Sequence, residues 1–418
     1  MTGVHSTVLG QRRPAILACL LLLLEPLRPR AEDRVEYRFE GYYEDGNRTD
    51  VTTTGVYVEK ELNPKLVLKG EFVYDAISGA SPTGGPPSSG DSQVQLMQFD
   101  DRRYAGFVEV DIKQGRFTHQ PQFAYSYEHD YKSVSLAWNE LIDFNQRNTT
   151  LAVGFSHNFD QVLGTYQPEF ADKGTSDFLL GMTQILGPRT TLTFNVTLGY
   201  SDGYLTDPYK GVNFYYAFPD PSYDALPYGA NSAEKRPGHR FRQVGWLGVN
   251  HYVKPLEGAL EASLRLGHDD WDVTSQTLAL AWYQKLGKHF TVAPLFRFYH
   301  QSAATFYATR FVGDPNLPDG TAYSVLPDGS LLFPGDPGYP GGGVIEEVPT
   351  WPGYFSSDYR LSQLNTYTYG AQVQARITEK VSLTVTFKRY HMVGTDNVTL
   401  QSAYPDANVI TAGFNVWF

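Results

Sequence analysis

Cysteine is almost absent from this chain of 418 residues, and its one cysteine, Cys19, lies close to the N-terminus. We expect that segment to be removed, which leaves a mature chain without a thiol. Disulfides, thiolate metal sites, iron–sulfur clusters, cysteine nucleophiles and covalent haem attachment are thereby excluded. Basic residues are also few, because 34 Lys and Arg stand against 45 Asp and Glu, a formal net charge of -11. A chain this acidic lacks the basic surface of a nucleic-acid binder, so we expect no nucleic-acid partner.

Long hydrophobic runs are missing as well. No segment approaches the ~20 consecutive apolar residues that a transmembrane helix needs. The apolar run at 15–24 follows Arg12 and Arg13 and has the length of a signal-peptide core. We therefore predict a signal peptide over residues 1–31, export from the cytoplasm, and one mature domain over residues 32–418.

Aromatic residues are abundant, with 29 Tyr and 25 Phe, and such residues favour strands. From residue 34 onward apolar and polar residues alternate, which predicts strands with two different faces. In the last segment Phe414 and Phe418 lie on one face, with Thr411 and Asn415 on the other. A soluble β-sandwich and a membrane β-barrel both alternate in this way, and they differ in the medium that the apolar face meets.

Strand and joint lengths separate these two folds. Most segments have about ten residues, the length at which a tilted strand crosses a bilayer. Every second joint has three or four residues, and the long joints, near 75–101, 201–238 and 301–361, fall only between them. Outer-membrane barrels have short turns at one end and long loops at the other. The predicted strands are 34–43, 50–60, 65–74, 102–113, 117–127, 133–144, 149–160, 176–186, 190–200, 239–253, 258–268, 274–286, 290–300, 362–376, 381–392 and 408–418.

The sequence therefore predicts an all-β fold: a transmembrane antiparallel up-and-down β-barrel of about 16 strands. The chain ends within a strand, and Thr411, Gly413, Val416 and Phe418 resemble the terminal signal that barrels present to the barrel assembly machinery. A barrel in outer-membrane lipid has no free edge, so the segment 34–43 must pair with 408–418. Around 239–253 the apolar residues change face between Trp246 and Leu247, which a bulge or a buried patch could explain.

Sixteen strands enclose a lumen too wide for side chains to fill. Charged residues of both signs occupy the predicted inner face. The predicted pore-lining residues are Arg38, Glu40, Lys69, Glu71, Glu109, Asp111, Glu261, Arg265, Arg297, Arg376 and Lys388. They could sort solutes or form ion-pair networks that stiffen the wall, and the interleaving of opposite charges favours the networks. Aromatic residues near strand ends fit lipid-interface girdles; these are Tyr37, Tyr43, Trp138, Trp246, Trp282, Tyr299, Tyr367 and Trp417.

Other clusters give weaker hypotheses. Loop 301–361 is rich in Gly, Pro and Asp, which form turns, and it either folds into the mouth or stands outside. Ser156 and His157 invite comparison with a hydrolase, but neighbours on a strand point to opposite faces. The segments 128–131 and 268–272 are typical of hairpin tips. The acidic residues of 268–272 could instead bind a cation and those of loop 301–361 Ca²⁺, but no regular ligand spacing supports a calcium site in the loop. We expect no catalytic residue, no cofactor and no metal site, and so no enzyme.

Two strings carry a family resemblance: Glu-His-Asp-Tyr-Lys-Ser at 128–133 and Asp-Phe-Asn-Gln-Arg-Asn-Thr-Thr at 143–150. They resemble the core signature of an uncharacterised Gram-negative outer-membrane family, domain of unknown function 3570. The resemblance covers nearly the whole mature chain and implies a barrel, but no activity. Asp143, Asn145, Arg147 and Asn148 then form a periplasmic turn, braced by Asp143 and Arg147 or contacting a periplasmic partner. Family members accompany exported flavin-transfer and small lipoprotein genes, which suggests a periplasmic lipoprotein or flavoprotein partner.

The leading hypothesis is a porin-like channel for small solutes in the outer membrane of a Gram-negative bacterium. The alternative is a plugged or sheath-type barrel that scaffolds a periplasmic or envelope redox partner. A surface hydrolase and a secreted soluble β protein are more remote alternatives.

Overall fold

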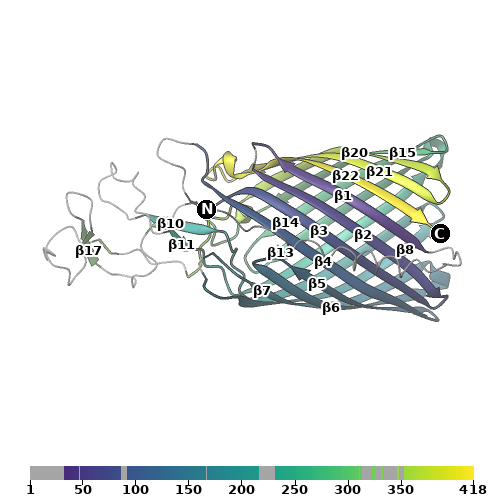
Figure 1. Ribbon diagram of the computed structural model, residues 1–418, viewed down its shortest axis with the longest axis horizontal. Coiled ribbons are helices and arrows are strands. Elements are labelled where there is room, and N and C mark those ends of the chain that lie inside the picture. Colours follow the sequence, from purple (N-terminus) through teal and green to yellow (C-terminus); the bar gives the residue numbers. More distant parts are fainter. Residues whose placement is uncertain are drawn as a thin grey trace, which may run out of the picture.

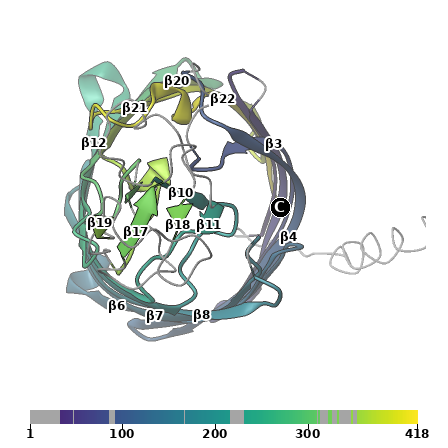
Figure 2. The ribbon, with the colours of Figure 1, turned by 90° about the vertical axis from the view of Figure 1, so that its left-hand side faces the viewer.

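Sixteen antiparallel strands close into one barrel (Figures 1 and 2). The computed structural model describes residues 33–46, 48–85, 92–165, 167–215, 231–309, 311–312, 322–325, 331–332, 346–347 and 353–418, so the predicted signal peptide and Cys19 lie outside the described residues. The barrel strands are β1 (Arg34–Glu44), β2 (Thr49–Asn63), β3 (Leu66–Pro82), β4 (Leu96–Gln114), β5 (Phe117–Tyr127), β6 (Tyr131–Phe144), β7 (Thr149–Val162), β8 (Ala171–Gly187), β9 (Thr190–Gly203), β12 (His239–Val253), β13 (Gly258–Asp269), β14 (Thr274–Leu286), β15 (Phe290–Gln301), β20 (Leu364–Thr378), β21 (Val381–Gly394) and β22 (Asp406–Trp417). Among these residues, no helix is long and apolar enough to cross a membrane.

The sixteen predicted strands are confirmed, and the clearest difference lies in the first long hairpin. Strands β3 and β4 remain paired as far as Pro82 and Leu96, so the loop expected over 75–101 is confined to 83–95. Alternation in the sequence did not predict this extension, because a strand that continues beyond the membrane into water can be polar on both faces. Alternation then gives no signal, although the backbone ladder continues.

The two terminal strands pair with each other, as a barrel in lipid requires. The register runs from Arg34 opposite Trp417 to Glu44 opposite Ala407, and the Phe418 amide donates to the carbonyl of Asp33 at 3.0 Å. No strand edge of the barrel is left open, which removes the unpaired backbone groups that lipid cannot satisfy.

Crosslinking across this seam tests the closure. Tyr37 lies opposite Phe414 in the register, and opposed Cα atoms of antiparallel strands are ~4.5–5.5 Å apart. In a chain without Cys19, Tyr37→Cys with Phe414→Cys is expected to crosslink within one chain under mild oxidation, which changes the mobility of the denatured chain on a gel. Tyr37→Cys with Phe387→Cys, one strand further round, is the control and should not crosslink. An open sheet would leave both pairs uncrosslinked.

The connections sort by length, as predicted. Two to four residues join strands at one end, which we call the short-turn end, as at 115–116 and 287–289. Gly115 and Gly287 supply the left-handed backbone of these turns, with φ of 64° and 65°. The long connections 204–238 and 302–363 lie at the opposite, long-loop end.

Alternation around the barrel divides each strand between an apolar outer face and a polar inner face. Phe155 (54% exposed), Leu136 (52%) and Phe414 (44%) lie on the outer face, where lipid tails replace water. Trp246, Tyr299 and Trp417 have the opposite parity and face the lumen, so their predicted place in a lipid-interface girdle is wrong. An aromatic residue near a strand end belongs to a lipid-interface girdle only if its position along the strand places it on the outer face.

Of the two explanations open for β12, the bulge is absent, because both registers of the strand are continuous. Trp246 faces the lumen, and its indole ring lies over Gly248, where an ideal Cβ would be 2.1 Å from the ring. The apolar residues of the strand therefore change face. A lumen-facing tryptophan, not an extra residue, causes the break in the pattern.

The long-loop end carries a small core of its own. Two three-stranded sheets form there, β10 (Gly211–Tyr215), β11 (Asn231–Ala233) and β16 (Phe311–Val312), and β17 (Ala322–Val325), β18 (Leu331–Leu332) and β19 (Glu346–Glu347). Figure 1 shows β17 well beyond the barrel. Three clusters of buried apolar residues, built around Trp271, Val212 and Leu364, lie at this end. In the described residues no comparable cluster fills the middle of the barrel.

Candidate functional site

The pairing register places all eleven predicted pore-lining residues on the inner face of the wall. On β1 to β4 these charges form networks: the Lys69 Nζ atom lies 3.0 Å from Glu109 and 2.8 Å from Asp111, and Arg38 lies 3.4 Å from Glu71. This half of the wall fits the bracing interpretation.

The other half of the wall differs. Arg265, Arg297, Arg376 and Lys388, on β13, β15, β20 and β21, form no ion pair with any described residue. Arg297 instead lies 5.8 Å from the centre of the Tyr299 ring. The sequence suggested that opposite charges interleave everywhere, but in space the unpaired basic residues gather on one side of the lumen.

Two loops meet over the long-loop end in an ion-pair network around the buried Glu234 and Asp358, which we call the cap network: Asp207, Glu234, Arg236, Asp358 and Arg360. Arg236 lies 2.6 Å from Glu234 and 2.8 Å from Asp358. Arg360 donates to Asp358 from its Nε atom at 2.9 Å and also pairs with Asp207. The network therefore ties loop 204–238 to the end of loop 302–363.

Burial makes these charges depend on one another. The side chain of Asp358 is 1% exposed, and burial alone would raise its pKa, but Arg360 and Arg236 hold that pKa below the usual range. Burial raises the pKa of Glu234 against the opposing effect of Arg236, and burial lowers the pKa of Lys210. Because the folded-state pKa of Asp358 is depressed, its stabilising contribution is present above the unfolded-state pKa and is lost only as the pH falls through the folded-state value.

The end of loop 302–363 is fastened to the barrel wall. Gln301, facing the lumen at the end of β15, donates from its Nε2 atom to the carbonyls of Arg360 and Ser362, both at 2.8 Å. Asp358 accepts the amide of Arg360 and begins the single turn η4 (Tyr359–Leu361). The sequence left two positions open for loop 301–361, inside the mouth or outside the barrel. Its C-terminal end folds across the mouth, and the β17 sheet lies outside the barrel.

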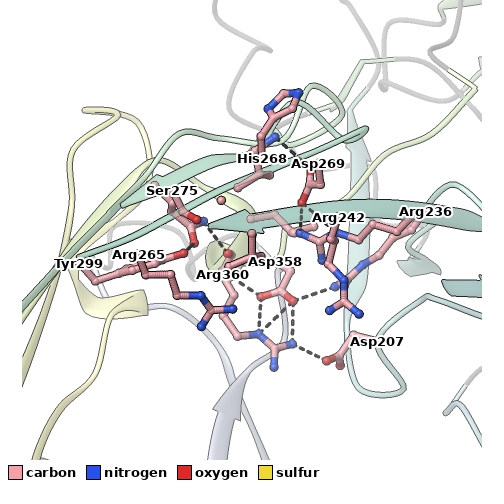
Figure 3. A pocket seen from close by; sticks show the side chains of 16 residues that line it. Asp207, Arg236, Arg242, Arg265, His268, Asp269, Ser275, Tyr299, Asp358 and Arg360 are labelled. Atoms are coloured by element: carbon pink, nitrogen blue, oxygen red, sulfur yellow. Dashed lines mark hydrogen bonds and ion pairs between the residues drawn. The ribbon is translucent and has the colours of Figure 1, made fainter. Parts of the chain in front are cut away.

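A cavity of about 360 Å³ lies between the cap network and the lumen wall (Figure 3). Its charged lining residues are Asp207, Arg236, Arg240, Arg242, Arg265, Asp269, Asp358 and Arg360. A second cavity, of about 1060 Å³, lies toward the short-turn end among lumen-facing residues such as Tyr283, Gln374 and Arg376. Both cavities are bordered by polar side chains and can hold water.

The turn with the family signature lies at the short-turn end. Asn145, Gln146 and Arg147 have φ of 49°, 54° and 68°, three consecutive left-handed residues without a glycine, and each costs free energy relative to ordinary backbone. Arg147 lies 3.5 Å from Asp143, and the Asn148 amide donates to the Asn145 carbonyl at 3.0 Å. This geometry braces the turn, and contact with a periplasmic partner stays a prediction.

The residues of the predicted assembly signal lie in β22 and just beyond it. Thr411 and Gly413 face the lumen, and the Thr411 hydroxyl donates to Glu40 at 2.9 Å. Val416 faces outward, opposite Val35 in the register, and Phe418 directly follows the strand. Recognition by the assembly machinery stays a prediction.

One group of side chains in the described residues could hold a metal ion, although the sequence predicted none. Ligand atoms of Asp101, His129 and Asp130 lie within 4.8 Å of one another. The Tyr209 hydroxyl donates to Asp130, and burial raises the pKa of that carboxyl. The sequence showed His129 and Asp130 as a hairpin tip, but Asp101 comes from β4 and only the fold brings it near.

The hydrolase hypothesis finds no support at the predicted residues. Ser156 faces the lumen, opposite Asp177, while His157 faces outward, opposite Ser176. The His157 Nδ1 atom lies 2.7 Å from the Ser176 Oγ atom, a pair that only the register between β7 and β8 reveals. No carboxylate among the described residues bonds to His157, so the pair lacks the third group that orients a catalytic base.

Comparison with known proteins identifies the family. A family model described as "Protein of unknown function (DUF3570)" matches residues 24–171 and 164–416. The chain belongs to this family. The resemblance seen in the sequence is thereby confirmed, and the signature turn and the closed barrel of this DUF3570 protein lie within the matched residues. A search of curated proteins found no match.

Solved structures similar to this DUF3570 protein are bacterial barrels. CdiB from Acinetobacter baumannii is 7% identical with a TM-score of 0.47, covering 92% of this chain and 60% of its own. The outer membrane protein OpdK from Pseudomonas aeruginosa is 8% identical with a TM-score of 0.40, covering 93% and 99%. The siderophore receptor PirA from Pseudomonas aeruginosa is 9% identical with a TM-score of 0.37, covering 93% and 81%. These similarities add nothing to the barrel that the strand pairing already shows.

Proposed function

We propose that this protein is a porin-like channel in the outer membrane, through which small polar solutes diffuse. The observation that carries the proposal is the polar lumen. Lumen-facing charges such as Arg265, Arg297 and Glu261 are exposed, and the clusters of buried apolar residues in the described chain lie at the long-loop end. Side chains that carry charge in the middle of a barrel need water around them, and water in the lumen supplies a path for solutes.

The outer face supports the same proposal. Apolar side chains such as Phe155, Leu180 and Val385 are exposed on the outer face of the barrel strands. An apolar outer band of this kind places a barrel in lipid. The cap network then covers part of the mouth and restricts which solutes enter. The proposal includes recognition of β22 by the barrel assembly machinery, and it assigns no catalytic activity to the protein.

Single-channel recording tests the proposal. The folded full-length protein without its signal peptide is expected to produce discrete conductance steps in planar bilayers, because the lumen holds water. The same preparation, heated until the barrel unfolds and its gel mobility changes, is the control and should produce none. Silent membranes from demonstrably folded protein would count against the channel.

A second candidate function is a barrel that holds a periplasmic lipoprotein or flavoprotein. The turn from Asn145 to Arg147 favours it, since consecutive left-handed residues without glycine cluster at functional surfaces. Affinity purification of the intact protein from outer membranes is expected to bring down such a partner. Gln146→Gly keeps the left-handed turn and removes the side chain, so it should reduce recovery of the partner while the barrel stays folded.

A further inference from the structure

Two arginines in the cavity beneath the cap network have no carboxylate of the described residues within hydrogen-bond distance. Arg242 and Arg265 point into the cavity from β12 and β13 (Figure 3). The nearest carboxylate to Arg242 is Asp177 at 3.9 Å, beyond hydrogen-bond distance. Arg265 makes neither a hydrogen bond nor an ion pair with any described residue. The cavity thus presents one guanidinium group without a partner among the described residues, Arg265, and one that is held only by a long ion pair, Arg242.

The three aspartates of the cavity cannot serve them, because each is already engaged. Asp269 pairs with Arg240 and also accepts the amides of Trp271 at 3.0 Å and Val273 at 3.1 Å. Asp358 accepts from Arg360 and Arg236, and Asp207 accepts from Arg360. Five arginines and three aspartates line the cavity, and Glu234 pairs with Arg236 from outside the lining. Arg265 is therefore the lining guanidinium that no carboxylate of the described residues reaches, and Arg242 is held only by the long contact to Asp177.

The fold holds these two arginines in place. Gly199 lies opposite Arg242 in the register, and an ideal Cβ there would lie 3.4 Å from Arg242 Nη2 and 2.5 Å from Asp177 Oδ1. The missing side chain therefore gives Arg242 room to lie along the wall. Arg265 lies opposite Trp246, whose ring covers Gly248, so a large flat side chain borders it.

Neutral donors complete the lining. Ser275 and Tyr299 come from β14 and β15 and lie beside Arg265 in Figure 3. A guanidinium binds a carboxylate or a phosphate through two parallel hydrogen bonds, and hydroxyl groups supply further donors to the same oxygens. A volume of about 360 Å³ is at the lower end of the range for small-molecule sites.

We propose that the cavity beneath the cap network is a binding site for a small oxyanion, a carboxylate or a phosphate, held by Arg242 and Arg265. This inference rests on the proposed channel for its role and names the solutes that the channel selects. Arg297, Lys388 and Arg376, further basic residues of the same side of the wall, also lie on the lumen face. An anion that leaves the site therefore meets further positive charge along the lumen.

Calorimetric titration of the folded full-length protein in detergent tests the site directly. Succinate and inorganic phosphate represent the two sources of the oxyanion, and glucose represents an uncharged solute of similar size. Succinate, phosphate or both should bind, and glucose should not. The tighter of the two anions identifies the source, and no binding of either overturns the proposal.

Variants link the binding to the two arginines. Arg242→Gln with Arg265→Gln keeps a polar side chain at each position and removes both charges. The loss of each hydrogen bond to a charged group weakens binding by at least about tenfold, so the affinity of the double variant should fall by at least about 100-fold. Glu261→Gln, on the lumen face of β13 but outside the cavity, is the matched control and should bind as the unmodified protein does. Unchanged affinity in the double variant would overturn the assignment.

Reversal potentials in a potassium chloride gradient test the role in transport. The unmodified channel is expected to be anion-selective, and Arg242→Gln with Arg265→Gln should shift the reversal potential toward that of a non-selective pore. Anion binding with silent membranes would overturn the channel and keep the site. Conductance without anion binding and without anion selectivity would support the channel and overturn the site.

Discussion

Replacement of Asp358 by alanine is expected to open the cap network while the barrel stays folded. Asp358 is 1% exposed and takes hydrogen bonds from both Arg236 and Arg360, so its loss leaves the buried Arg236 and the half-exposed Arg360 without the anion that they share. Breaking a buried pair in this way costs ~3–5 kcal/mol. The strands pair through their backbones independently of this side chain, so the cost falls on the loops.

Proteolysis of the native protein measures this effect. Trypsin cleaves after arginine, and ~3–5 kcal/mol of lost local stability corresponds to roughly 10²- to 4 × 10³-fold faster cleavage at Arg360 when opening is rapid. Asp270→Ala is the control, because Asp270 is an exposed residue at the same end whose ion-pair partner is His239 at 3.8 Å, and it should cleave at the unmodified rate. Equal cleavage rates in Asp358→Ala and the unmodified protein would show that the network does not hold the cap.

A charge on the outer face is expected to destabilise the barrel strongly, and the same charge one residue away is not. Phe155 is 54% exposed on the outer face of β7, between Trp138 and Phe178 in the register. Arginine at the lipid-facing midplane of a barrel costs ~2–4 kcal/mol. Ser156, its neighbour, faces the lumen opposite Asp177, where an added arginine meets water and a carboxylate.

Urea unfolding of Phe155→Arg and Ser156→Arg in lipid vesicles measures the difference. Phe155→Ala separates the loss of the ring from the gain of the charge. If Ser156→Arg lowers the free energy of unfolding as much as Phe155→Arg does, the assignment of inner and outer faces is wrong. That outcome would also remove the basis for a polar lumen.

The interior of the barrel shows why a strand-by-strand interpretation of charge was incomplete. Along β13 the sequence places Glu261 and Arg265 on one face, which suggests that opposite charges offset each other. In the folded barrel an ion pair depends on which side chains lie opposite or diagonal on neighbouring strands. Lys69 meets Glu109 and Asp111 on β4, whereas Arg265 meets Trp246 and Thr277 and stays unpaired.

The sequence by itself determined the barrel, its strand count, its closure and the sorting of short turns and long loops. Each follows from local properties: a side-chain period of two, the length of strand that crosses a bilayer, and backbone groups that lipid cannot satisfy. Only the tertiary structure decided the cap network, the cavity and the two halves of the lumen wall. Asp207, Arg236 and Asp358 are far apart in the chain and carry no shared pattern, so their meeting depends on how the loops fold across the mouth. Long-range contacts between charged side chains are set by register and loop path, and no local period encodes them.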